Sequence, residues 1–335
     1  MYKGHWIWDI EEETVKNMDT VQSYDAIIVV TPSDYRRLEG NYSRLLSNMP
    51  ARRVLYVGNE EVHSLVEAIG NNNKAGFADE NDILPFACVH DIMKCALKDI
   101  LNGRELPRGV TGWYYQQFLK MQYSFICQDA YYLVWDGDTI PCKPFSMFPG
   151  DGSGVPYLDL KQEYHEEYFR VMSKLIPGMG KSIKKSFISE HMLINCDIMK
   201  DLIHEIESNH AIPGEFYWEK IINAIDVDKL QSNSFSEFET YGTYVTRRYP
   251  QAYHFRDWHS FRYGGLYFNT DTISDRDFAW LGRDFYAISF EKGHVVREDH
   301  QNLFDNPKYQ EKLSARRMLE IAQEEAEEGY LEVWD

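Results

Sequence analysis

The first third of the chain alternates short β-branched segments with helical segments, and this alternation constrains the fold more than any other feature. Residues 25–30 (DAIIVV) form an apolar run that predicts a buried strand, and the tetrapeptide TPSD that follows is a typical helix start. A helical pattern covers residues 35–48, followed by a second strand over 53–58 and a second helix over 60–69. This order predicts an α/β fold around a mostly parallel sheet.

Helix and strand patterns continue through the rest of the chain. Thr111 is expected to cap a helix over 112–126, and a strand is expected over 131–136. Further helices are expected over 90–101, 163–176, 197–208, 215–225 and 234–247, and further strands within 186–195 and over 284–290. We expect a loop over residues 249–265. Without a repeat or a long linker, we expect a single domain over 1–305 and a charged helix in the segment 306–335.

Charge and cysteine usage exclude several classes of protein. The 335 residues carry a formal net charge of −18, which argues against broad binding to nucleic acid or to an anionic membrane. No apolar run approaches the roughly 18–20 residues of a membrane span, and the first residues lack the apolar core of a signal peptide. The five cysteines form no CxxC pair, as expected in a reducing compartment. We expect a cytoplasmic protein and leave open a peripheral position at the inner face of the membrane.

One acidic triplet stands out by its context. Asp-x-Asp occurs at 136–138, 226–228 and 275–277, but only the first follows a strongly predicted buried strand. Ligands of open α/β sheets bind at the carboxyl ends of strands. Two carboxylates there can hold Mg²⁺ or Mn²⁺, which stabilises the negative charge of a leaving diphosphate.

Residues 131–141 (YYLVWDGDTIP) resemble the metal-binding DxD motif of GT-A nucleotide-sugar glycosyltransferases, especially bacterial enzymes that build capsule or O-antigen polysaccharides. Residues 112–120, 189–195 and 235–242 resemble further segments of such enzymes, so the resemblance covers about residues 25–270. It implies a GT-A (Rossmann-like) sheet flanked by helices. The nucleotide-binding half would be about 22–145, and a helical, loop-rich acceptor half would be about 146–305.

The resemblance also implies roles for single residues. Asp138 would be the direct metal ligand and Asp136 would contact the ribose or the metal, with His254 or His259 as a third ligand. Of these two histidines, His254 is our first choice. The nucleotide would contact Thr31, Pro32, Asp34, Gln117, Lys120 and Asp136.

An inverting sugar transfer needs a base for the acceptor proton, and the candidates are Glu237, Glu239 and His191, with Glu190 beside it. Residues two apart on a helix point about 200° apart, so Glu237 and Glu239 cannot both face one cleft. We favour Glu237, with Ser236 capping the helix start. A retaining enzyme needs no such base.

The expected function is therefore metal-dependent transfer of a sugar from a nucleotide-diphosphate sugar, with a UDP-sugar favoured, to a glycan or lipid-linked saccharide. The acidic last helix is a possible contact to partners in polysaccharide assembly. Two alternatives stay open. One is an inactive, aromatic-rich glycan-binding protein. The other is a Mg²⁺-dependent nucleotidyl or phosphoryl transferase, although residues 177–182 (PGMGKS) lack the first glycine of a phosphate loop.

Overall fold

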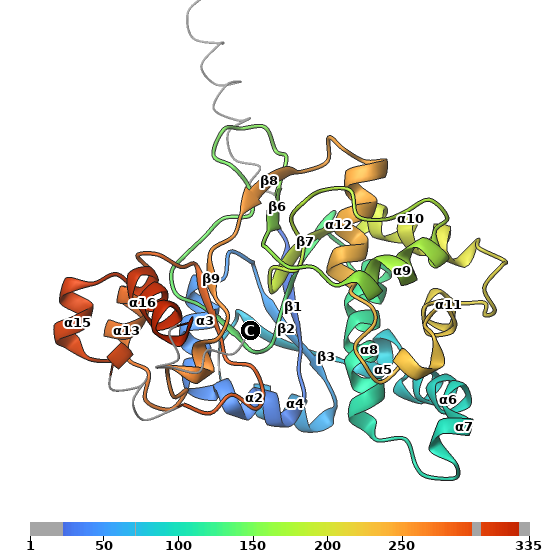
Figure 1. Ribbon diagram of the computed structural model, residues 1–335, viewed down its shortest axis with the longest axis horizontal. Coiled ribbons are helices and arrows are strands. Elements are labelled where there is room, and N and C mark those ends of the chain that lie inside the picture. The colour runs from blue at the N-terminus through green and yellow to red at the C-terminus, as the bar shows by residue number, and fades with distance from the viewer. Residues whose placement is uncertain (1–22, 71, 297–302, 328–335) are drawn as a thin grey trace, which may run out of the picture.

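Five strands form the central sheet in the order β3-β2-β1-β4-β7 (Figure 1). The computed structural model describes residues 23–70, 72–296 and 303–327. The strands are β1 (Asp25–Val29), β2 (Val54–Gly58), β3 (Ala75–Asp79), β4 (Tyr131–Trp135) and β7 (His191–Asn195). β1, β2, β3 and β4 are parallel, and β7 runs antiparallel to β4. The expected α/β fold with a mostly parallel sheet is confirmed.

The predicted helix start after β1 is confirmed, but the helix is shorter than expected. Thr31 accepts a hydrogen bond from the backbone N–H of Asp34, and Pro32 occupies the first turn of α2 (Pro32–Leu38). The 3₁₀ turn η1 (Glu39–Asn41), which contains Gly40, then separates α2 from α3 (Tyr42–Asn48). Asn59 caps α4 (Glu60–Glu67), the second predicted helix.

Helices of the middle of the chain form the right-hand part of Figure 1. They are α5 (Glu80–Ile83), α6 (Phe86–Ala96), α7 (Lys98–Leu101), α8 (Arg108–Gln122), η2 (Tyr123–Phe125), α9 (Glu166–Leu175), α10 (Cys196–Glu207), α11 (Tyr217–Ala224), η3 (Val227–Lys229) and α12 (Glu237–Arg248). The expectation that Thr111 caps a helix is wrong. The helix begins at Arg108, directly after Pro107, and the buried Thr111 hydroxyl lies 2.9 Å from His90 Nδ1.

The second half also contains short strands. One of them, within the strand expected over 284–290, is confirmed, and the sequence pattern did not indicate the others. β5 (Thr139–Pro141), β10 (Ala287–Ser289) and β9 (Ser260–Phe261) form one small sheet, and β6 (Tyr157–Leu160) and β8 (His254–Asp257) form another. Residues 249–265 are therefore not a simple loop. The remaining elements are η4 (Gly264–Leu266), α13 (Asp275–Leu281), α15 (Pro307–Lys312) and α16 (Ala315–Glu327). The predicted last helix is thus interrupted, and its expected end over 328–335 lies outside the described residues.

The central sheet separates two hydrophobic cores. Ile27 and Val134 face one core, which α6, α8, α10, α11 and α12 complete. Ile28 and Trp135 face the other, which α2, α3, α4 and α13 complete. This alternation follows from the two-residue period of a strand. Among the described helices, none combines the length and apolar character that a membrane crossing requires.

Candidate active site

A cleft of about 1070 Å³ opens at the carboxyl ends of β1, β2 and β4. Parallel strands bring their carboxyl ends to one edge of a sheet, and for this reason side chains far apart in sequence meet there. Eight of the residues singled out in the sequence line this cleft: Thr31, Pro32, Asp34, Gln117, Lys120, Asp136, Asp138 and Glu237.

The Asp136-Gly137-Asp138 turn is fixed from both sides. The Asp136 N–H donates to the carbonyl of Glu190 at 2.9 Å, and Phe290 N–H donates to the carbonyl of Asp138 at 2.7 Å. Glu190 adopts a φ of 61°, a conformation that costs a non-glycine residue about 1–3 kcal/mol. A Cβ at Gly137 would lie 2.5 Å from Val30 Cγ1, so the turn approaches β1 as closely as only glycine allows.

Asp138 is the carboxylate whose charge is least compensated in this cleft. Within the described chain its side chain accepts one hydrogen bond, from Thr139 Oγ1 at 3.0 Å. Burial and the neighbouring Asp136 carboxylate raise the pKa of Asp138 to about 7. A cation bound beside it would relieve both effects.

Lys120 joins two other carboxylates of the cleft. Its Nζ donates to Asp136 Oδ1 at 2.7 Å and to Glu237 Oε1 at 2.8 Å. Burial alone would lower the pKa of Lys120, but the two carboxylates hold it above its usual value. Burial also raises the pKa of Glu237, against the effect of Lys120. Gln117 supports this arrangement, since its Oε1 accepts the Glu237 backbone N–H at 3.0 Å.

The residues after β1 form a second polar wall. The Thr31 hydroxyl donates to Asp34 Oδ2 at 2.6 Å, and Arg37 Nη1 lies 3.3 Å from Asp34 Oδ1. The cap that starts α2 thereby also orients a hydroxyl and a carboxylate toward the cleft.

Five predicted site residues are not among those that line the cleft: Glu239, His191, Glu190, His254 and His259. Glu239 lies on the other side of α12, where it accepts hydrogen bonds from Ser186 Oγ and from the Phe187 N–H. His191 is fully buried, with Nε2 2.8 Å from Asp159 Oδ2. His254 is exposed on β8 and is not among the residues that line the cleft with the two aspartates.

The other Asp-x-Asp triplets have structural roles, as expected from their context. Asp226 pairs with Lys174 and Arg170. Asp277 completes a capping box with Ser274 at the start of α13.

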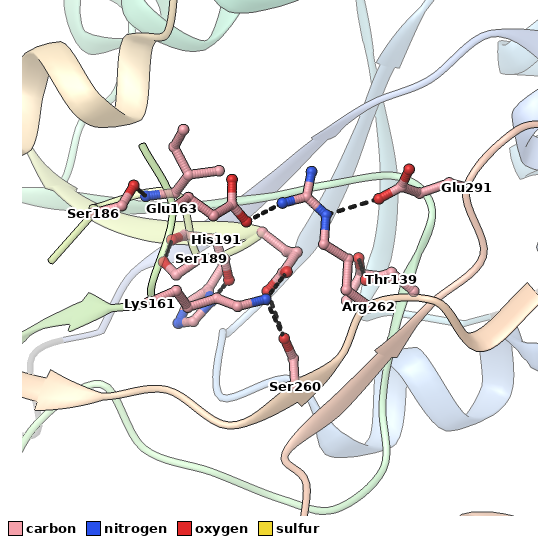
Figure 2. Close-up of polar contacts among 12 residues, drawn as sticks. Thr139, Lys161, Glu163, Ser186, Ser189, His191, Ser260, Arg262 and Glu291 are labelled. Carbon is pink, nitrogen blue, oxygen red and sulfur yellow. Dashed lines mark hydrogen bonds and ion pairs between the residues drawn. The ribbon is translucent and has the colours of Figure 1, made fainter. Parts of the chain in front are cut away.

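Sequence reasoning did not identify the charged group Glu163–Arg262–Glu291, which also lines the cleft. The Arg262 guanidinium lies between Glu163 and Glu291, as Figure 2 shows. These three residues come from segments about 30 to 100 positions apart, so no local pattern indicates their contact.

A divalent cation fits the acidic turn, although the protein supplies few ligands. Asp138 and Asp136 offer the hard carboxylate oxygens that Mg²⁺ and Mn²⁺ prefer. In the described ranges there is no group of three or more His, Cys, Asp or Glu residues that could hold a metal. The remaining coordination positions would therefore fall to water and to substrate phosphates, as is common for Mg²⁺.

Solved structures show distant similarity to this chain. Mouse xyloside xylosyltransferase 1, in its apo form, has a TM-score of 0.43 at 12% identity, with 83% of this chain and 100% of that chain covered. The mannosyltransferase Ktr4p from S. cerevisiae in complex with GDP has a TM-score of 0.42 at 10% identity, with 76% and 80% covered. Both TM-scores are below 0.5.

Sequence comparison gives a firmer assignment. No curated protein matches the chain. The model of a family of unknown function, DUF6492, matches residues 48–304, which is well over half of the sequence. The matched range includes the acidic turn, Lys120 and Glu237. The chain therefore belongs to the DUF6492 family.

Proposed function

We propose that this protein is a glycosyltransferase that moves a sugar from a nucleotide-diphosphate sugar, with a UDP-sugar favoured, to a saccharide acceptor. The observation that carries the proposal is the Asp138 carboxylate, which lies in a large cleft at the end of a central strand. Its pKa, raised to about 7, and its single hydrogen bond from Thr139 support a site for a cation and an anionic substrate. The resemblance of residues 131–141 to the DxD motif supports the same proposal.

Asp138, with Asp136, would hold Mn²⁺ or Mg²⁺, which supplies positive charge to the leaving diphosphate. Thr31 and Asp34 are placed to bind ribose or base, because their polar atoms face the cleft beside the end of β1. Lys120 has a second role besides binding the nucleotide. It fixes the distance between Asp136 and Glu237, since it donates to both.

Glu237 is proposed as the base of an inverting transfer. The acceptor oxygen forms a bond to the anomeric carbon, the bond from that carbon to the diphosphate oxygen breaks, and the hydroxyl proton passes to Glu237. Of the two carboxylate oxygens of Glu237, Lys120 donates to Oε1, so Oε2 is the oxygen proposed to take the proton. Burial raises the pKa of Glu237, which makes it a stronger base than an exposed glutamate. A retaining reaction is the alternative, and the anomeric configuration of the product distinguishes the two.

The proposed acceptor is a glycan or a lipid-linked saccharide. Trp113, Tyr168 and Phe235 line the cleft, and aromatic faces cover the apolar faces of sugar rings. We propose action on the cytoplasmic side, in polysaccharide assembly. The charged helix α16 is our candidate surface for partners in that process.

The test is metal-dependent hydrolysis of a panel of nucleotide sugars by the wild type and by Asp138→Asn. We expect release of a nucleoside diphosphate from one donor and a loss of about 100-fold or more in the variant, or on chelation of the metal. Asp226→Asn is the matched control, because it changes another Asp-x-Asp triplet that lies outside the cleft, and it should keep the activity.

The products separate the proposal from its alternatives. Release of a nucleoside monophosphate with a sugar phosphate would indicate a nucleotidyl transferase instead. Saccharide binding without any binding of nucleotide or metal would indicate a glycan-binding protein. Either result would reject the proposed reaction.

A further inference from the structure

Arg262 lies in the cleft between two glutamates, and the proposed reaction does not use it. Its Nε donates to Glu291 Oε1 at 2.8 Å, and its Nη1 donates to Glu163 Oε1. Figure 2 shows the guanidinium between these carboxylates, with a third nitrogen that carries no dashed line. That nitrogen, Nη2, has no hydrogen-bond partner within the residues that the structure describes. It is therefore available to an oxygen of a ligand.

Arg262 is also close to the acidic turn. The Phe290 N–H donates to the carbonyl of Asp138, and the next residue is Glu291, a partner of Arg262. The Glu291 carboxylate is among the charges that raise the pKa of Asp138. Asp138 and Arg262 thus line the same cleft and are linked through Phe290 and Glu291.

Arg262 is more accessible than Lys120, the cation that contacts Asp136 of the turn. The Lys120 side chain is 5% exposed and already contacts two carboxylates, whereas the Arg262 side chain is 34% exposed. A guanidinium offers donors in a planar fork that matches the oxygens of a phosphate, which an ammonium group does not.

The two glutamates give the group a net negative charge, because two carboxylates surround one guanidinium. An incoming diphosphate is repelled by this surplus charge and has to compete for the donors of Arg262. Glu163 lies between β6 and α9, and its Oε2 is also 3.6 Å from His165 Nε2, whereas Glu291 follows Phe290, which is hydrogen-bonded to the turn.

We infer that Arg262 binds a phosphate group of the donor through Nη2 and that Glu163 competes with this phosphate for the guanidinium. The inference rests on the proposed function, which supplies the diphosphate. It adds a binding residue and an internal competitor that limits affinity for the donor.

The test is calorimetric titration of the full chain with inorganic pyrophosphate, with and without Mg²⁺, which avoids any assumption about base or sugar. We expect Arg262→Gln to weaken pyrophosphate binding by about tenfold or more. We expect Glu163→Gln to strengthen it about three- to tenfold. The double variant should bind as weakly as Arg262→Gln alone, because the effect of Glu163 acts through the guanidinium.

Two control variants separate this contact from general charge effects. Arg248→Gln removes a positive charge from the Arg248–Glu205 pair on the surface, and Glu61→Gln removes a negative charge from the cleft wall without contact to Arg262. Neither should change pyrophosphate binding more than about twofold. A thermal unfolding transition in each variant, like that of the wild type, shows that the variant folds.

Several outcomes would overturn the inference. They are absence of pyrophosphate binding by the wild type, unchanged binding by Arg262→Gln, no gain in Glu163→Gln, or an equal gain in Glu61→Gln. Failure of the proposed function gives a different result: no nucleotide sugar is hydrolysed, while pyrophosphate binding still depends on Arg262.

Discussion

The geometry of the acidic turn depends on Gly137, the residue between the two aspartates. Its place against β1 allows no side chain, since a Cβ there would lie 2.5 Å from Val30 Cγ1 and 3.2 Å from the Val29 carbonyl oxygen. Both contacts belong to the central strand and the residue after it, which cannot move without disturbing the sheet. A methyl group at this position would therefore shift the turn rather than its neighbours.

We predict that Gly137→Ala displaces both aspartates and lowers metal-dependent donor hydrolysis by about tenfold or more, because small displacements of charged groups are costly in catalysis. Stability should fall by about 1–3 kcal/mol. Gly150→Ala is the control, because a Cβ there has no neighbour within 4 Å. Hydrolysis assays and urea unfolding of both variants give the comparison, and full activity of Gly137→Ala would show that the turn tolerates displacement.

Residues at the ends of predicted strands were found from the sequence because their signal is local. Asp136 and Asp138 follow a β-branched run, and Thr31 sits in a helix-start motif after another. Arg262 and its two glutamates carry no such signal, since only the tertiary fold brings them together. A pattern of neighbouring residues also could not predict that His254 lies on a strand of a small sheet.

At the scale of elements, α12 connects the cleft to the sheet. Ser236 caps it, as expected, by accepting the Glu239 N–H at 3.2 Å. Glu237 faces Lys120 and Glu239 faces Ser186, so the prediction that these two glutamates point apart is confirmed. Further along the helix, a Cβ at Gly242 would lie 2.1 Å from the Phe187 ring. The helix packs closely here because it has no side chain at this position.

We predict that Gly242→Ala destabilises the protein by about 1–3 kcal/mol through overpacking, although alanine is the better helix former. Gly112→Ala in α8 is the matched control, since a Cβ there has no neighbour within 4 Å. That variant should be stabilised by about 0.5–1 kcal/mol. Urea unfolding measures both changes. If both variants gained stability, the contact between Gly242 and Phe187 would not restrict the helix.

Long elements were predicted better than short ones. The five-residue strands β1, β2 and β4 have β-branched, apolar sequences that single out a buried strand. β9 has two residues, too few for any periodicity, so its pairing depends on the surrounding core, whereas β10 lies within the strand that was expected over 284–290. Thr111 resembled a cap because threonine often is one, but Pro107 sets the start of α8.

At the scale of the whole molecule, the amino ends of neighbouring strands are held by one charged network. Asp25 opens β1, the middle strand of the central sheet, and is 4% exposed. Arg52 Nε donates to its Oδ1 at 2.9 Å and Arg53 Nη2 to its Oδ2 at 2.6 Å, just before β2. Arg52 also donates to Asp129, just before β4, at 2.7 Å. The network ties three strands together at the edge opposite the cleft.

This network predicts a pH-dependent stability. Burial alone would raise the pKa of Asp25, but hydrogen bonds from Arg53 and Arg52 hold it below its usual value. A carboxyl group with a lowered pKa in the folded state binds its proton more readily when unfolded. It therefore stabilises the fold above its unfolded pKa of about 3.9, and this contribution is lost as the pH falls through the folded value.

Asp25→Asn should accordingly lower the free energy of unfolding by about 1–3 kcal/mol at pH 7, because two arginines lose their carboxylate partner. The difference from the wild type should stay constant from pH 7 to about pH 5 and shrink below about pH 4, as the pH falls toward the lowered pKa of the folded wild type and its carboxyl group takes up a proton. Urea unfolding across this range measures it, with the exposed Asp228→Asn as control. A difference that persists at low pH would mean that shape and packing, rather than the charge of Asp25, hold the three strands together.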